Sequence, residues 1–467
     1  MSYSLQTDLY QINMAYAYYM DNVHTKKAVF ELYFRKKPFG SGYVVFAGLE
    51  RVIEVINNFK FSNLDIEYLR KYGYNESFLM YLKDLSFSGS LKSVKEGEII
   101  FAKEPIIIVE APLIEAQLLE TLLLNVVGFQ TLVATKASRI KRLIKDASAI
   151  EFGARRAQET SAALWGARSS YIVGFDGTSL LNAGKMFDIP VFGTHAHSFI
   201  QVYQDEYIAF MKYAKVHKDV VFLIDTYDSI KSGIINAIKV ANELKDNINF
   251  VGVRIDSGDL AYTSKRVRKI LDEAGYTSTK IFVSNDLDEN TIASLLLEGA
   301  KIDVYGIGTK LITAYDQPSL GTVYKLVQID NKDVIKISNN IEKITTPGSK
   351  KVLRVINKTN KSEGDLVALK NEVFEKNMPI KLQAESNPLL FKEITNYTLL
   401  NIHHSIFENG NLVYDIPTLD EIRSYHKIAI ERIWDEVLRF KNPAKYYVDL
   451  SQKCLDNKLS LIKVHIE

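Results

Sequence analysis

Arg254 and Asp256 close an apolar run in the middle of the chain, Phe250-Val-Gly-Val-Arg-Ile-Asp-Ser-Gly-Asp. Residues two positions apart on a strand point to the same side. The planar guanidinium group of Arg254 can hold a carboxylate or a phosphate through two hydrogen bonds. Asp256 can orient sugar hydroxyls or stabilise a developing positive charge. The alternative is an ion pair with a purely structural role.

The segment Thr194-His-Ala-His-Ser places His195 and His197 at an expected strand end, where a metal pair is one interpretation. The alternative is one functional histidine beside an incidental one. A metal-dependent hydrolase would need further histidines near the same strand ends. The remaining histidines lie elsewhere, at His24, His217, His403, His404, His426 and His465. The sequence therefore disfavours the metal site.

Three further clusters could bind a flat, phosphorylated substrate. Gly306, Gly308, Thr309 and Lys310 can form a backbone phosphate cradle with an added hydroxyl and positive charge. The second cluster comprises Ser284, Asn285 and Asp286. It could bind a diphosphate and its Mg²⁺, or it could simply form the N-cap of a helix. The third cluster comprises Phe152, whose ring can stack on a pyridine, and Arg155, whose guanidinium group can pair with a carboxylate on that pyridine. The alternative for the third cluster is a core phenylalanine beside surface arginines.

All these clusters follow short apolar runs that alternate with helical patterns at intervals of roughly 20–30 residues. Helices are expected at Ser229–Asn242, Ser264–Ala274 and Asn290–Glu298. Seven or eight such units predict an irregular, TIM-like parallel α/β barrel with its reactive residues at the carboxyl ends of the strands.

The flanking regions differ from this rhythm. A strand is expected at Ala28–Arg35, with Phe30, Leu32 and Phe34 on one face, and a helix at Leu419–Phe440. We therefore expect an N-terminal α+β region at 1–120, the catalytic barrel at 121–330, and a C-terminal segment at 331–467 that completes the smaller domain.

The composition is that of a globular protein, with 47% hydrophobic and 24% charged residues and a net charge of +2. Nothing in it indicates a nucleic-acid or membrane partner. The single cysteine, Cys454, is typical of a reducing compartment, and the first residues do not resemble a signal peptide. Because the longest apolar patches are short or interrupted, at 106–109 and 118–127, we expect no membrane span and a cytoplasmic location.

Ordered motifs over most of the chain resemble the nicotinate phosphoribosyltransferases. They include Thr7-Asp-Leu-Tyr-Gln, Phe30-Glu-Leu-Tyr-Phe-Arg-Lys-Lys-Pro-Phe, Phe46-Ala-Gly-Leu, Glu151-Phe-Gly-Ala-Arg-Arg-Ala, Gly174-Phe-Asp-Gly-Thr-Ser, Gly193-Thr-His-Ala-His-Ser, Leu223-Ile-Asp-Thr-Tyr-Asp, Gly252-Val-Arg-Ile-Asp-Ser-Gly-Asp, Ser284-Asn-Asp-Leu-Asp, Gly306-Ile-Gly-Thr and Gly321-Thr-Val-Tyr-Lys-Leu-Val. One departure is Leu180, where the family usually has Asn.

The resemblance implies an α/β barrel with an open-sandwich domain, in a homodimer whose partner would contribute Tyr10. It implies ATP-stimulated synthesis of nicotinate mononucleotide from nicotinate and 5-phosphoribosyl 1-diphosphate, an ATP-coupled, ligase-type reaction in NAD salvage. His197 matches the family's phosphorylated histidine, and Thr194 and Arg254 match positions that bind nicotinate. The remaining substrate-binding candidates are Asp176 and Ser198. Mg²⁺ would arrive on the substrate diphosphate, with Asp256 and Asp286 as candidate ligands.

Two rival functions remain beside the hydrolase. A nicotinamide phosphoribosyltransferase shares the chemistry but binds a neutral amide, and the segments at Glu151 and Gly174 favour the acid-specific enzyme. A catalytically inactive scaffolding homologue is the second rival. The candidate residues His197, Arg254 and Thr309 are all present, which argues against it.

Overall fold

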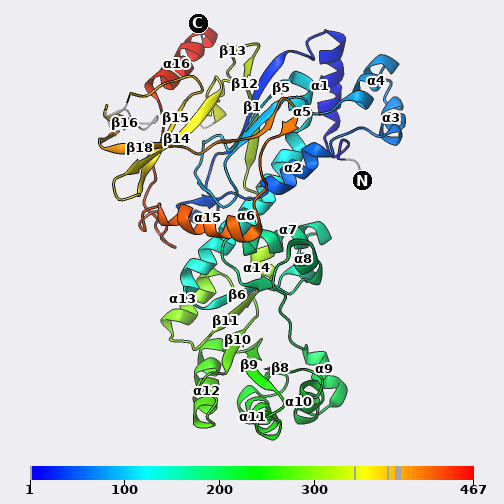
Figure 1. Cartoon of the computed structure of the whole chain (residues 1–467), viewed down its shortest axis with the longest axis vertical. Coiled ribbons are helices and arrows are strands. Elements are labelled where there is room, and N and C mark those ends of the chain that lie inside the picture. Colours follow the sequence, from blue (N-terminus) through cyan, green and yellow to red (C-terminus); the bar gives the residue numbers. More distant parts are fainter. Residues whose placement is uncertain (1–2, 341–342, 376–377, 384–390, 467) are drawn as a thin grey trace. The chain divides into compact units, whose positions relative to one another are not determined.

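The computed structural model describes residues 3–340, 343–375, 378–383 and 391–466 (Figure 1). By its internal contacts the chain divides into two compact units. The central unit is Lys136–Pro318, and the discontinuous unit combines Met1–Thr135 with Ser319–Glu467. The sequence placed the middle segment at 121–330.

The central unit is built on one parallel sheet of six strands, visible in the green part of Figure 1. Its spatial order is β7 (Gly177–Thr178), β6 (Ser148–Glu151), β11 (Val304–Ile307), β10 (Lys280–Val283), β9 (Asn249–Ile255) and β8 (Asp219–Leu223). The helices of this unit are α7 (Thr160–Tyr171), α8 (Leu181–Phe187), α9 (His197–Tyr203), α10 (Glu206–Ala214), α11 (Ile234–Glu243), α12 (Leu260–Glu273), α13 (Glu289–Leu297) and α14 (Thr309–Ile312).

The central sheet is a half-barrel. Alternate residues of five neighbouring strands face one cavity of about 600 Å³, among them Ile150, Val221, Val251, Phe282 and Val304. A single parallel bridge continues the sheet beyond β7, between Thr178 and Val191. Within the described residues no ladder joins that edge to β8, so the predicted parallel α/β architecture is confirmed as a half-barrel rather than as a closed barrel.

Aspartates cap the N-termini of three helical segments that follow the central strands. Asp228, Asp259 and Asp288 each accept a hydrogen bond from a backbone N–H in the first turn of the next helical segment. Such N-caps satisfy donors that a helix leaves unpaired. The predicted helices are found at α12 and α13, and the first one consists of a π-helical turn (Ser229–Gly233) followed by α11.

The discontinuous unit contains a seven-stranded antiparallel sheet with the order β13 (Lys332–Asp333), β12 (Thr322–Ile329), β1 (Lys27–Phe34), β5 (Ile107–Pro112), β3 (Ser90–Ser93), β19 (His404–Glu408) and β20 (Asn411–Leu412). A four-stranded sheet has the order β18 (Tyr397–Asn401), β14 (Lys350–Asn357), β15 (Ser362–Leu369) and β21 (Val448–Leu450). Two small pairs complete the strands, β2 (Val44–Val45) with β4 (Ile99–Ile100), and β16 (Ile380–Gln383) with β17 (Phe391–Ile394).

The helices of the discontinuous unit are α1 (Leu9–Met20), α2 (Leu49–Asn57), α3 (Asn63–Arg70), α4 (Glu76–Asp84), α5 (Leu113–Leu118), α15 (Leu419–Glu431) and α16 (Gln452–Ile466), and a 3₁₀ turn spans Pro38–Gly40. Helix α6 (Glu120–Ile144) crosses the boundary between the two units. The helix predicted at 419–440 starts where expected, with a capping box between Thr418 and Glu421, but it ends at Glu431. Ile433 and Val437, whose spacing suggested that the helix continues, are buried by turns instead.

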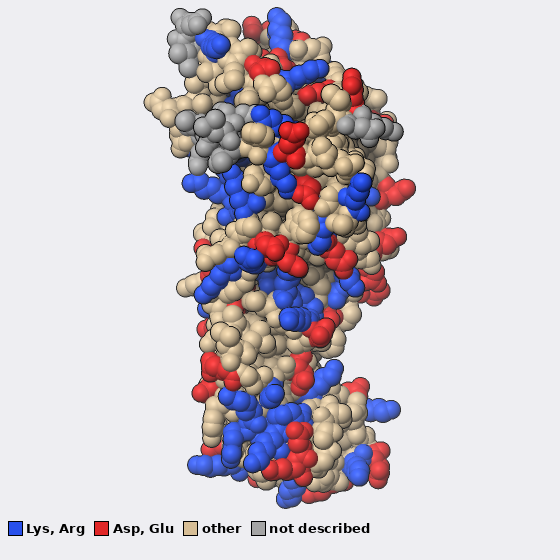
Figure 2. All heavy atoms as spheres, turned by 90° about the vertical axis from the view of Figure 1, so that its left-hand side faces the viewer, with Lys and Arg blue, Asp and Glu red and all other residues tan. Residues whose placement is uncertain are grey.

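One apolar segment is longer than the sequence analysis allowed. Helical residues Leu113–Ile144 are long and apolar enough to cross a membrane by length and composition alone. About two thirds of their most apolar window (67%) is buried inside the protein, which is typical of a core helix. On the face shown in Figure 2, positive and negative side chains are interspersed, in line with the small net charge.

His403, in the loop after β18, gives the discontinuous unit a pH-dependent stability. Its Nδ1 accepts a hydrogen bond from the Val352 N–H at 3.4 Å, and its Nε2 donates to the Pro105 carbonyl at 2.8 Å. Burial lowers the pKa of His403 to about 4, so the folded ring stays neutral. The unfolded chain takes up the proton near pH 6.5, and protonation therefore favours unfolding as the pH falls from about 6.5 to about 4.

We expect the free energy of unfolding to fall by about 2 kcal/mol between pH 7 and pH 5 because of His403. A His403→Gln variant should lose this component of the pH dependence, although it should be less stable at pH 7. Urea denaturation at the two pH values measures the difference. The exposed His465 provides the control, since its replacement by Gln should leave the slope unchanged. If the free energy of unfolding changed equally with pH in the wild type and in the His403→Gln variant, His403 would not be the source of the pH dependence.

Candidate active site at the carboxyl ends of the central strands

Arg254, near the end of β9, is the centre of a hydrogen-bonded cluster supplied by the ends of β9 and β10 and by the loop before α9. Its Nε donates to the Ser284 hydroxyl at 2.9 Å, its Nη1 donates to the Thr194 hydroxyl at 3.2 Å, and its Nη2 lies 3.3 Å from Asp256 Oδ1. Ser284 in turn donates to Asp256 Oδ1 at 2.5 Å. The predicted pair of Arg254 and Asp256 therefore forms, and both side chains keep some exposure, at 17% and 24%.

An aromatic ring borders this cluster. The Arg254 guanidinium lies 5.6 Å from the centroid of the Phe152 ring, and both residues line the 600 Å³ cavity together with Thr194. The ring packs directly on the backbone of Gly306, because a Cβ added to Gly306 would lie 2.5 Å from the ring carbon Cδ2. Gly306 therefore has a packing role beside the phosphate-binding one that the sequence suggested.

Replacing Gly306 with Ala should displace the Phe152 ring from this position. Overpacking of this kind typically costs about 1–3 kcal/mol, so we expect a lower midpoint of thermal unfolding in the variant. Gly193 lines the same cavity, but a Cβ there would meet nothing within 4 Å, which makes Gly193→Ala the matched control. The two unfolding midpoints, measured by calorimetry, should differ. Equal midpoints would show that the ring moves aside at no cost.

His197, the first residue of α9, faces two carboxylates. Its Nδ1 lies 3.1 Å from the Thr226 hydroxyl, and its Nε2 lies 3.7 Å from Asp256 Oδ2 and 4.0 Å from Asp225 Oδ1. The side chain of Asp225 is only 2% exposed, and its Oδ1 has no hydrogen-bond partner among the described residues. Its Oδ2 accepts hydrogen bonds from the Asp256 N–H and the Ser257 hydroxyl. Asp256 thus connects the imidazole of His197 with the guanidinium of Arg254.

The two histidines of the Thr194 segment do not form a pair. The segment is a loop before α9, so the strand geometry that would align them does not apply. His195 is buried, its Nε2 accepts a hydrogen bond from the Leu223 N–H, and burial lowers its pKa to about 4. Among the described residues there is no group of three or more His, Cys, Asp or Glu side chains that could hold a metal ion.

The glycine-rich segment ends β11 and begins the short helix α14 at Thr309. Lys310 is not available as a free positive charge, because its Nζ lies 2.8 Å from the carboxylate of Asp288, the N-cap of α13. The hydrogen bond to Asp288 raises the pKa of the Lys310 ammonium group. In the described part of the chain no hydrogen bond joins Thr309 to Arg254 or to His197, and Thr309 is not among the residues that line the 600 Å³ cavity.

The remaining candidates take several positions. Arg155 and Ser198 are exposed, and neither lines the cavity. Asp176 lines the same cavity as Arg254, but it precedes β7 and accepts a hydrogen bond from the Ala149 N–H near the amino ends of the strands. Asn285 has a φ of 121°, a strained backbone at a strand end. Asp286 is exposed and does not line the cavity. Tyr10, in α1 of the discontinuous unit, is 50% exposed.

Asp225 and Thr226 were not predicted as site residues, although their motif could be recognised in the sequence. They come after Ile224, just beyond the end of β8 at Leu223, and because Leu223 pairs with Arg254, Asp225 is level with Asp256 of the neighbouring strand. Glu151, at the end of β6, was also missed as an ionisable group. Burial raises its pKa to about 7, although hydrogen bonds from Thr178 and Gly153 oppose that shift. Thr178 donates to the Glu151 carboxylate at 2.7 Å, which joins the ends of β6 and β7.

Comparisons with known proteins cover nearly the whole chain. It matches the nicotinate phosphoribosyltransferase N-terminal domain over residues 5–128, the nicotinate phosphoribosyltransferase family over 147–377 and the C-terminal domain of that enzyme over 349–458. It is 55% identical to the nicotinate phosphoribosyltransferase of Bacillus subtilis, over 99% of this chain and 95% of that one. The corresponding enzyme of Dictyostelium discoideum is 38% identical, over 97% and 87% of the two chains.

Solved structures resemble the fold as well. The crystal structure of human nicotinic acid phosphoribosyltransferase superimposes with a TM-score of 0.88 at 28% identity, covering 97% of this chain and 99% of the human one. A nicotinate-nucleotide pyrophosphorylase from Pyrococcus furiosus has a TM-score of 0.72 at 22% identity, over 92% and 95% of the two chains, and shares the fold.

Proposed function

Because this chain belongs to the nicotinate phosphoribosyltransferase family, we propose that it joins nicotinate to 5-phosphoribosyl 1-diphosphate and releases diphosphate. The observation that carries the proposal is the position of Arg254, held by Thr194, Ser284 and Asp256 beside the ring of Phe152. A guanidinium fixed next to an aromatic ring suits a flat ligand with one carboxylate.

The guanidinium retains donors for that carboxylate. An arginine has five N–H groups, and the described side chains around Arg254 engage one on Nε, one on Nη1 and one on Nη2. One N–H on each Nη nitrogen is left for the two oxygens of the substrate. With nicotinate bound in this way, its ring would lie against Phe152, which also packs on Gly306.

In the proposed reaction the pyridine nitrogen attacks C1 of the ribose. The new N–C1 bond forms as the C1–O bond to diphosphate breaks, and the bonding electron pair leaves with the diphosphate, so no proton is transferred. The ribose develops positive charge during this exchange. The carboxylate of Asp256 lies between Arg254 and His197, where its negative charge would stabilise that transition state.

Mg²⁺ would neutralise charge on the leaving diphosphate. The donor set fits a metal that enters with its substrate, since the described residues provide no cluster of three ligands but do provide single carboxylates at Asp256 and Asp286. Mg²⁺ typically binds through one or two carboxylates together with substrate phosphates and water. The phosphate cradle would be Gly306, Gly308 and Thr309.

We further propose that ATP phosphorylates His197. The partnerless Oδ1 of buried Asp225 favours a proton on the nearby Nε2, so that Nδ1 carries the lone pair and accepts from the Thr226 hydroxyl. The γ-phosphoryl group would pass to that nitrogen with ADP as leaving group. Water would later cleave the N–P bond and release phosphate. The negative phosphoryl group would strengthen the binding of the Mg²⁺-bearing substrate in each cycle.

The remaining assignments are also proposals. A homodimer is proposed because Tyr10, at 50% exposure, and its neighbour Leu9, at 48%, leave an apolar surface at the start of α1. A cytoplasmic location is proposed because the only cysteine, Cys454, is free and buried.

The main alternative is a preference for nicotinamide. An amide presents only one acceptor oxygen to the two free N–H groups of Arg254 and brings no negative charge to the guanidinium, so the acid should be favoured. The test supplies both pyridines together with 5-phosphoribosyl 1-diphosphate and Mg²⁺, with and without ATP, and follows each mononucleotide. We expect nicotinate mononucleotide, in larger amount with ATP. Formation of the amide product in preference, or of neither product, would overturn the proposal.

A further inference from the structure

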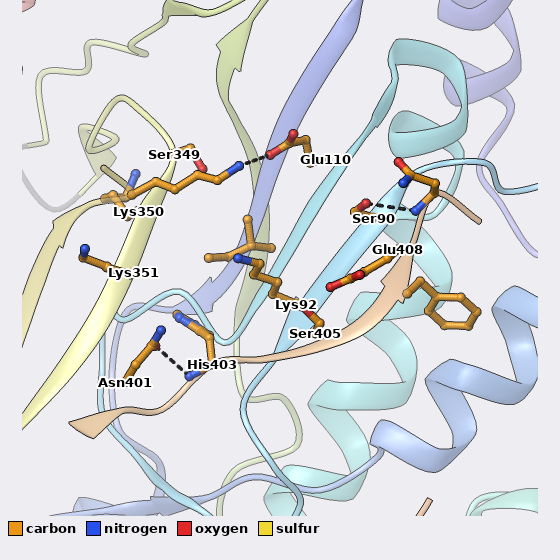
Figure 3. A pocket seen from close by; sticks show the side chains of 14 residues that line it. Ser90, Lys92, Glu110, Ser349, Lys350, Lys351, Asn401, His403, Ser405 and Glu408 are labelled. Carbon is orange, nitrogen blue, oxygen red and sulfur yellow. Dashed lines mark hydrogen bonds and ion pairs between the residues drawn. The ribbon is translucent and has the colours of Figure 1, made fainter. Parts of the chain in front are cut away.

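A second cavity, of about 360 Å³, lies in the discontinuous unit and contains none of the residues discussed above as catalytic. The seven-stranded sheet contributes one wall through Lys92 on β3 and Ser405 on β19, which are paired across the sheet. The start of β14 and the end of β15 contribute the other through Ser349, Lys351 and Lys370. We refer to this cavity as the basic pocket. Figure 3 shows Lys92 extending from its strand into the space between Lys350 and Lys351 on one side and Glu408 on the other.

Positive charge exceeds negative charge in the basic pocket. Four lysines and two glutamates line it. The buried Lys350 is paired with Glu31 at 2.9 Å and donates to two backbone carbonyls, so it has no donor left for a ligand. Glu110 is shared by Lys370, at 2.7 Å, and by Lys27. Burial alone would raise the pKa of Glu110, but hydrogen bonds from these two lysines outweigh it and lower that pKa.

Lys92 differs from the other three lysines of the basic pocket in having neither a counterion nor a hydrogen-bond acceptor among the described residues. No hydrogen bond or ion pair joins its ammonium group to any residue that the structure describes, although it lies beside the buried ring of His403. That ring is already saturated by Val352 and Pro105, and Lys92 contributes to the lowering of its pKa. A neutral histidine cannot supply positive charge here, so the pocket does not depend on its protonation.

The remaining polar groups suit an oxyanion. Ser349 and Ser405 have hydroxyls without a partner among the described side chains, and the Asn401 carbonyl oxygen accepts from the His403 N–H at 3.1 Å, which leaves its amide NH₂ group free to donate. Lys351 uses one of its three N–H groups on the Glu372 carbonyl. Charge-assisted hydrogen bonds from ammonium groups together with hydroxyls are the usual way in which proteins hold phosphate.

We propose that the basic pocket binds a phosphate group of a small anion, through Lys92, Lys351 and the two serines. The volume lies within the range of about 300–1,000 Å³ that small-molecule sites occupy, and a free phosphate fills only part of it. A phosphate carried by a nucleotide therefore fits as well as inorganic phosphate. The site goes beyond the proposed function, because no residue in it takes part in the transfer reaction.

The test measures amide hydrogen exchange of the full-length protein with inorganic phosphate and, separately, with adenosine 5′-monophosphate. Sodium chloride at matched ionic strength is the blank. Peptides covering 88–95 and 401–409 report the basic pocket, and peptides covering 302–312 report the glycine-rich segment of the proposed active site. We expect added phosphate, in at least one of the two forms, to protect both sets of peptides. The form that protects 88–95 identifies the source of the phosphate group.

The decisive variant is Lys92→Met, which keeps the length of the side chain and removes its charge. Because Lys92 has no partner to lose, the fold should be retained. The phosphate concentration at which protection of peptides covering 88–95 is half-maximal should rise about 10-fold, as expected for the loss of one charge-assisted hydrogen bond. Protection of peptides covering 302–312 should stay unchanged. Lys332→Met, at an exposed position of β13 on the edge of the same sheet, is the matched control and should behave as the wild type. Protection confined to 302–312, or equal protection of 88–95 in both variants, overturns the proposal.

Discussion

An Asp256→Asn variant should lose about 10²–10³-fold in kcat, while the KM for nicotinate changes far less. The substitution keeps the shape of the side chain and its acceptor for the Ser284 hydroxyl, but it removes the charge that lies between Arg254 and His197. That charge matters chiefly when the ribose becomes positive. The cost therefore belongs to the transition state and corresponds to about 3–4 kcal/mol. Steady-state kinetics with nicotinate as the varied substrate separate the two constants.

Asp272→Asn provides the control for this prediction. Asp272 lies on α12 of the same unit and is paired with Arg268 on the surface, so its loss changes the net charge equally without touching the cluster. Its kcat should stay within about twofold of the wild type, as surface ion pairs contribute little. A kcat for Asp256→Asn within the same range would mean that Asp256 only positions Arg254.

A His197→Ala variant should lose ATP hydrolysis that is coupled to mononucleotide synthesis by about 10³-fold or more, because the proposed phosphoryl acceptor is gone. Synthesis without ATP should continue, since Arg254, Phe152 and Asp256 are retained. Release of ADP and formation of mononucleotide, measured in the same reaction, give the coupling ratio. Acid-labile, alkali-stable labelling from γ-labelled ATP should also disappear in the variant.

The exposed His217 offers the comparison, because its ring packs against Tyr213, at 4.2 Å between centroids, and does not belong to the cluster around Asp256. His217→Ala should keep both the label and the coupling ratio. If His197→Ala retained full ATP-stimulated turnover, another residue would have to carry the phosphoryl group, or ATP would act without a covalent intermediate.

The alternation of strands and helices in the central unit could be predicted from the sequence because each apolar run is short and ends in a polar cluster. Closure of the sheet could not, since it depends on how far six strands curve and not on any single segment. The strand at Lys27–Phe34 shows a different limit. Its alternation suggested one buried face, yet Val29 and Glu31 on the other face are buried as well, at 2% and 1%. The second face is covered by residues distant in sequence.

The site shows why residue type alone is insufficient. Asp225 and Asp228 occur in one motif, and so do Asp256 and Asp259. In both motifs the first aspartate follows the strand and faces the cluster, whereas the second, three residues later, caps the following helical segment. Spacing from the last buried strand residue therefore separates a chemical role from a structural one. The buried Oδ1 of Asp225 and the contact of Phe152 with Gly306 required coordinates.

The shared carboxylate of Asp256 also has a thermodynamic consequence. His197 and Arg254 both lie within 4 Å of it, so a change of charge on either residue alters the free energy of ligands held by the other. Such coupling is reciprocal at equilibrium. If a phosphorylated imidazole tightens the hold on the sugar diphosphate by some factor, then bound sugar diphosphate must shift phosphorylation of the imidazole by that same factor. ATP would then be consumed mainly by enzyme molecules that already carry substrate, which limits futile hydrolysis without a separate regulatory element.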